Sequence, residues 1–150
     1  MRFCLYALIG LLTAGGIKTD TALPFDKFFD FGAEVTRLKV ANPMVVKTVM
    51  KDGLSETITG PILDWKAEFG PFIEADINKP AFRDRYEVIE LTDGEIDRVI
   101  YKALDDRLAV KEVTLDYLGS DCIGLHITRL FDNKVMKGRS VLHYVPGKSY

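Results

Sequence analysis

Residues 86–118 read YEVIELTDGEIDRVIYKALDDRLAVKEVTLDYL, and apolar and polar side chains follow one another with a period close to two. This period is typical of strands that bury one face. Turn signals interrupt the stretch at Asp93-Gly94 and Asp105-Asp106, and further ones follow at residues 119–121, 132–133 and 146–147. Runs of about ten residues between such turns favour neighbouring antiparallel strands, so this half of the chain predicts a β-meander.

Two amphipathic segments precede the meander, and their apolar spacing predicts helices. The first begins at Phe25 and ends at Asn42-Pro43, because a residue before proline avoids the helical region. The second runs from residue 62 to residue 77 and has Gly70-Pro71 in its middle, which predicts a kink or two short helices. Between them, the turn Lys51-Asp52-Gly53 joins two strand-like runs, as in a β-hairpin.

Together these patterns predict an α+β fold, in which an antiparallel β-meander of about five to seven strands forms a curved sheet packed on two N-terminal helical segments. One side of the second segment and one strand face of the meander should bury each other. The residues concerned are Trp65, Phe69, Phe72 and Ile73 on the segment and Ile123, Leu125 and Ile127 on the strand. We expect residues 25–150 to form a single domain that is either truncated at its C-terminus or missing a final strand, because the chain stops just after the turn signal at residues 146–147.

The N-terminal residues have the three regions of a secretory signal peptide. Arg2 is followed by the apolar run Phe3–Leu12 and then by small residues up to Gly16. A membrane anchor would need about twenty apolar residues, and Lys18 ends this run too early. The sequence therefore predicts a signal peptide at residues 1–16, a polar linker at 17–24 and an exported protein in the periplasm or at the outer membrane.

Charge and composition argue against several classes of partner. The formal net charge is −2, and the 20 lysines and arginines form no basic stripe of the kind that holds a phosphate backbone. No glycine-rich phosphate loop or other cofactor motif occurs. Nucleic acid is therefore excluded as a partner, and we expect no cofactor.

Cys122, His126 and His143 are the only cysteine and histidines beyond the predicted signal peptide. If Asp132-Asn133 is a two-residue loop, Cys122 falls opposite His143, and a thiol would lie beside a base as nucleophilic catalysis requires. Cys122 and His143 are thus catalytic candidates, although the same register puts both on the outer face, where an inert thiol is the simpler interpretation. His126 would lie too far along its strand to join them, so we expect no metal site.

A second catalytic candidate is a pair of carboxylates on the second helical segment. Two carboxylates can perform acid–base chemistry on a glycosidic bond, and the segment carries Asp64, Glu68, Glu74 and Asp76. The alternative interpretation is that they are solvated charges on the polar side of that segment.

The aromatic side chains of the helical segments are the candidates for binding an apolar ligand. Phe28, Phe31, Trp65 and Phe72 could line a groove where a curved sheet wraps around the helices. The alternative is that they simply fill the core on the concave side of the sheet.

Residues 72–82, FIEADINKPAF, are preceded by Asp64-Trp65, and the chain ends with YVPGK at residues 144–148 followed by Ser149 and Tyr150. These stretches resemble small uncharacterised lipoproteins of Gram-negative bacteria. The resemblance implies an envelope location and no particular activity. The Leu12-Thr13-Ala14-Gly15 stretch is lipoprotein-like, but no cysteine follows it, so membrane association through a lipid anchor stays open. Locally, Asn78 is predicted to cap the preceding helix in a left-handed conformation.

The function hypothesis is a non-catalytic, exported cell-envelope protein that binds an apolar small molecule or another envelope protein. The alternatives are a hydrolase acting on envelope polymers and a structural or assembly subunit.

Overall fold

The computed structural model describes residues 25–132 and 137–150 and has an α+β fold, as predicted. Its elements are α1 (Phe31–Ala41), β1 (Met44–Lys51), β2 (Leu54–Pro61), α2 (Trp65–Glu68), α3 (Gly70–Glu74), the 3-10 turn η1 (Pro80–Phe82), β3 (Tyr86–Asp93), β4 (Ile96–Ala103), β5 (Val110–Leu118), β6 (Asp121–Asp132) and β7 (Lys137–Tyr144). The predicted signal peptide and linker lie outside the described residues. Within those residues, no helix has the length and apolar character needed to cross a membrane.

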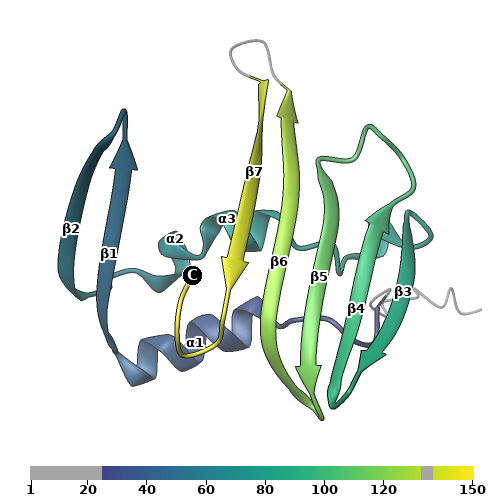
Figure 1. Cartoon of the computed structure of the whole chain (residues 1–150), viewed down its shortest axis with the longest axis horizontal. Coiled ribbons are helices and arrows are strands. Elements are labelled where there is room, and N and C mark those ends of the chain that lie inside the picture. The colour runs from purple at the N-terminus through teal and green to yellow at the C-terminus, as the bar shows by residue number, and fades with distance from the viewer. Residues whose placement is uncertain (1–24, 133–136) are drawn as a thin grey trace, which may run out of the picture.

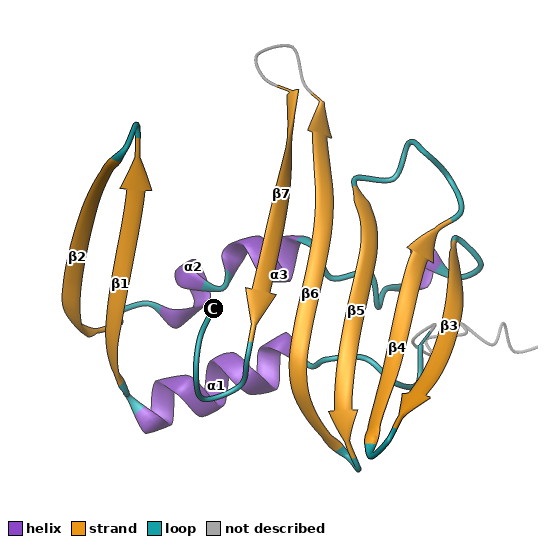
Figure 2. Ribbon diagram, in the orientation of Figure 1, coloured by secondary structure: helices purple, strands orange, loops and turns teal. Residues whose placement is uncertain are grey.

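Strands β3 to β7 form a five-stranded antiparallel sheet in sequence order, which confirms the predicted meander (Figure 1). Strands β1 and β2 pair only with each other, so the hairpin is a separate two-stranded ribbon. The helices α1, α2 and α3 lie on one side of the large sheet (Figure 2). The other face of that sheet carries no described helix.

The core lies between these helices and the inner face of the sheet. Trp65, Phe69 and Phe72 are 2%, 0% and 4% exposed, and they belong to the same buried cluster as Leu125 and Ile127, both 0% exposed. The predicted burial of the second segment against the meander is therefore confirmed for these residues. At about 25 cal/mol per Å² of buried apolar surface, such a cluster is the main favourable contribution to folding.

The first helix starts later than predicted. Residues 25–30 are not helical, and α1 begins at Phe31 because Asp30 caps it, with Oδ1 accepting from the Ala33 amide at 2.9 Å. The preceding residues are held by tertiary contacts instead. The Phe25 amide donates to Asn78 Oδ1 at 3.1 Å, and the Tyr101 hydroxyl donates to the Lys27 carbonyl.

Four local predictions upstream of the meander can be compared with the structure. The hairpin turn is confirmed, since Asp52 and Gly53 have φ of 51° and 79°, and α1 ends at Ala41 with Asn42 as its C-cap, as expected from Pro43. The break at Gly70-Pro71 gives two short helices, α2 and α3. The prediction for Asn78 is wrong, because its φ is not positive and its side chain accepts from Phe25 instead of capping a helix.

The register of β6 and β7 differs from the prediction. Asp132 pairs with Lys137, so the connection is residues 133–136, outside the described residues, and not a two-residue loop. A bulge also interrupts the β5–β6 pairing, where Asp116 pairs with Gly124 and Tyr117 with Cys122. Ile123 is the extra residue of this bulge, and at 37% exposure it does not join the core as predicted.

Candidate functional site

A groove of about 640 Å³ lies between the hairpin, α1 and the C-terminal turn. Its walls include Leu38 of α1, residues 44–48 of β1, Trp65 of α2, Tyr144 of β7 and residues 147–150. Figure 1 shows β1 as the hairpin strand nearer to β7, with the C-terminal turn below the space between them. The groove thus lies where the two sheets come closest without pairing.

The wall from β1 is the edge of that strand. Successive side chains of a strand point to opposite faces, so a hollow that is lined by five consecutive residues must border the backbone edge. Met44 to Thr48 are all lining residues. Since β1 pairs with β2 on its other side and with no other described strand, this edge presents unpaired backbone groups.

Trp65 provides a buried polar atom at the groove. Asp64 caps α2 by accepting from the amides of Lys66 and Ala67 at 3.0 and 3.1 Å, which fixes the first turn on which the indole sits. The indole is 2% exposed, and its ring centre lies 6.1 Å from that of Tyr150. Its Nε1–H is buried and has no acceptor among the residues that the structure describes. An unsatisfied buried N–H of this kind costs the fold stability.

Two ion pairs set the electrostatics of the groove. Arg37 binds Glu34 at 2.6 and 2.8 Å, and the Tyr144 hydroxyl also donates to Glu34. The hydrogen bond from Arg37 holds the pKa of Glu34 below its usual value, and burial raises the pKa of Tyr144. Lys47 binds Glu68 at 2.6 Å. Two of the three cations that line the groove are therefore paired with carboxylates, which favours a largely apolar occupant.

The hairpin beside the groove exposes many apolar side chains. Met44, Val46, Met50 and Leu54 are 69%, 67%, 76% and 77% exposed. A β-rich, apolar, two-stranded ribbon with so much exposed surface is typical of a segment that binds another chain.

A second hollow of about 680 Å³ is lined by Phe25, Phe28, Phe29 and Phe31 and by parts of α1 and α3. The ring of Phe28 lies 5.5 Å from that of Tyr101, and the ring of Phe29 lies 5.2 Å from that of Phe31. These rings pack on the core cluster. Among the predicted ligand-binding residues, Phe31 and Phe72 are buried, Phe28 is half-buried, and only Trp65 lines the groove beside β1.

The predicted proximity of Cys122 and His143 is wrong. Cys122 pairs with Tyr117, whereas His143 pairs with His126, because the β6–β7 register is shifted and the bulge at Ile123 turns Cys122 toward the core. The Cys122 thiol donates to the Gly124 carbonyl, and burial raises its pKa. A thiol with a raised pKa and no adjacent base is a poor nucleophile.

The interpretation that separated His126 from His143 is also wrong. The two imidazoles are direct cross-strand neighbours, with ring centres 4.1 Å apart. Within the described residues, no group of three or more histidine, cysteine, aspartate or glutamate side chains could hold a metal ion.

The carboxylates of the second segment have separate structural contacts. Asp64 caps α2, Glu68 binds Lys47, and Glu74 binds Arg129 at 3.3 Å. Asp76 accepts from the Asn78 amide at 2.8 Å. None of these contacts joins two of the carboxylates in a pair that faces the groove.

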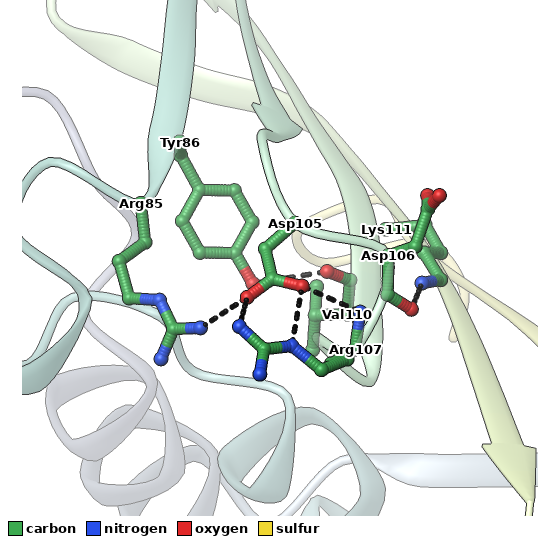
Figure 3. A network of polar contacts seen from close by, with 7 residues as sticks. All are labelled: Arg85, Tyr86, Asp105, Asp106, Arg107, Val110 and Lys111. Atoms are coloured by element: carbon green, nitrogen blue, oxygen red, sulfur yellow. Dashed lines mark hydrogen bonds and ion pairs between the residues drawn. The ribbon is translucent and has the colours of Figure 1, made fainter.

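The most extensive polar network lies at the β4–β5 connection (Figure 3). Asp105 accepts from Arg85 at 2.8 Å and from the Arg107 side chain at 2.9 and 3.0 Å, and these hydrogen bonds hold the pKa of Asp105 well below its usual value. The Tyr86 hydroxyl donates to the Val110 carbonyl at 2.9 Å beside it. Since both arginines bind the same carboxylate, the network holds the β4–β5 connection to the start of β3.

Comparisons with protein-family models, with curated proteins and with solved structures found no match for this chain.

Two of these features escaped the sequence analysis for different reasons. The groove depends on the position of the hairpin beside α1 and the C-terminal turn, and no local pattern encodes that position. The pairing of the two histidines depends on where the β6–β7 turn is centred, and the turn signal at Asp132-Asn133 puts that centre two residues too early.

Proposed function

We propose that this protein is a non-catalytic binding module that holds an extended, largely apolar segment of a partner protein in the groove beside β1. The observation that carries the proposal is the unpaired β1 edge that borders this groove. The sequence pattern at residues 1–16 supports the further proposal that the protein acts in the cell envelope.

Addition of a strand to β1 would use two features of the site, namely the unpaired backbone edge and the exposed apolar side chains of the hairpin. An extended segment would pair its backbone with the β1 edge, which gives affinity, and its alternate side chains would contact the apolar side chains of the hairpin, which gives specificity. An acyl chain would leave the strand edge unpaired, so the groove favours a peptide over a lipid.

The occupant need not carry charge. Arg37 and Lys47 are each paired with a glutamate, and Lys148 at the C-terminal turn is the remaining cation of the lining. We therefore expect an apolar segment that tolerates a single acidic residue near Lys148. Neither Cys122 nor the carboxylates lie in an arrangement that supports the hydrolase alternative better than this one.

The test has two stages. Peptides that bind this protein are first selected from a displayed random library, and the binding of the selected peptides is then followed by tryptophan emission and hydrogen exchange. Trp65 is the only tryptophan of the chain, so a change in its emission reports occupancy of the groove directly. Binding should also slow hydrogen exchange of the β1 amides, because those that face the groove become paired.

The control uses two exposed serines in turns. Ser149 lines the groove and Ser120 lies at the β5–β6 turn, so Ser149→Phe should abolish binding and Ser120→Phe should leave it unchanged. Peptides that bind Ser149→Phe as well as the parent, or that leave β1 exchange unaffected, would rule out this site.

A further inference from the structure

Both histidines of the chain meet at one point on the outer face of the large sheet. The chain contains two histidines, His126 on β6 and His143 on β7, and the two are direct partners in the β6–β7 register. Their ring centres lie 4.1 Å apart with a 38° angle between the ring planes. Both residues are exposed, on the face opposite the helices, so the pair is open to solvent.

This spacing suits joint coordination of one ion. Directly opposed residues on antiparallel strands have Cβ atoms about 5 Å apart, which brings two imidazoles to the same side of the sheet. An ion bound to two imidazole nitrogens at about 2 Å from each needs those nitrogens roughly 3 Å apart, which is compatible with rings this close. Two ladder-paired strands hold the side chains in place, so little ordering is required on binding.

The surroundings leave room for the ion. Thr114 on β5 is the partner of His126 on the other side, and it is small. Glu112 and Asp116 flank Thr114 on β5, and Asp116 is bound by Arg98 at 2.6 and 2.9 Å. Among the described residues, no third histidine, cysteine or carboxylate joins the two histidines in a group that could hold a metal ion. Gly124, two residues before His126, has no side chain that could cover the pair. The remaining coordination positions are therefore left to water or to a ligand from another molecule.

We infer that His126 and His143 form a two-histidine site for a divalent transition-metal ion of the class that prefers imidazole. Zn²⁺, Ni²⁺ and Cu²⁺ belong to this class, whereas Mg²⁺ and Ca²⁺ prefer oxygen ligands. The site lies on the opposite face from the buried core and is independent of the groove beside β1. It would give the outer face an ion with open coordination positions.

The experiment is a calorimetric titration of the untagged protein with Ni²⁺ and Zn²⁺, with Mg²⁺ as the oxygen-preferring control. We expect one ion per chain for Ni²⁺ and Zn²⁺ and no heat from Mg²⁺. Because the chain has two imidazoles, proton NMR gives a second readout: Ni²⁺ should broaden the ring resonances of both histidines at the same ion concentration.

Single substitutions decide the outcome. His126→Ala and His143→Ala should each abolish binding at ion concentrations that saturate the parent, while Cys122→Ser should bind as the parent does. Unchanged thermal unfolding of the ion-free variants shows that the sheet is intact. The inference is overturned if Ni²⁺ does not bind, if binding survives either histidine substitution, or if Cys122→Ser abolishes it.

Discussion

Replacement of Phe69 by alanine should remove a large share of the stability of this protein. Phe69 is 0% exposed, and its ring centre lies 5.1 Å from that of Tyr144, 5.2 Å from that of Phe72 and 6.1 Å from that of Trp65. It therefore joins α2 and α3 to the end of β7. Removing a fully buried phenylalanine ring costs about 3–5 kcal/mol, and a domain of this size has only about 5–15 kcal/mol of stability to lose.

Urea unfolding followed by circular dichroism measures the effect, and emission of Trp65 gives an independent probe in the same samples. Leu63→Ala is the matched control, because Leu63 is also apolar but 98% exposed, and its truncation should change the free energy of unfolding by no more than about 0.5 kcal/mol. Equal urea midpoints for the two variants, together with parent emission already typical of a solvated indole, would refute the packing described above.

Three further outcomes are expected. Asp105→Asn should make the melting temperature depend less on pH in the acid range. The pKa of Asp105 is depressed below its ordinary 3.8, so its contribution to stability is present above about pH 4 and is lost as the pH falls. Melting temperatures of the parent and the variant at pH 7 and pH 3 would show the difference. Gly53→Ala should destabilise the hairpin by about 1 kcal/mol, seen as faster hydrogen exchange in β1 and β2, because φ is 79° there. The Cys122 thiol should react slowly with a disulfide reagent at pH 8 and rapidly in urea, since burial raises its pKa.

The sequence predicts those features of the fold that depend on local chemistry. The Asp52-Gly53 turn needs two residues that tolerate positive φ, and Gly70-Pro71 cannot stand in the interior of a helix, so both predictions are confirmed. The start of α1 was misplaced because the aromatic residues from Phe25 onward have helical spacing but are used in tertiary packing. The capping side chain of Asp30, three residues before the Ala33 amide, was the local signal that marks the true start.

Two departures from regular strand pairing determine which residues meet on β6 and β7, and hydrophobic periodicity predicts neither. Moving the centre of the β6–β7 turn two residues along the chain keeps every side chain on its predicted face but changes every cross-strand partner, which is why His143 meets His126 and not Cys122. A single extra residue has the opposite effect: Ile123 shifts the faces on one side of the bulge only, so Cys122 turns inward while Leu125 and Ile127 stay buried as predicted. Face predictions therefore hold on the unbulged side, whereas the predicted β6–β7 partners are wrong throughout, so a dyad inferred from strand register requires the position of the turn to be known first.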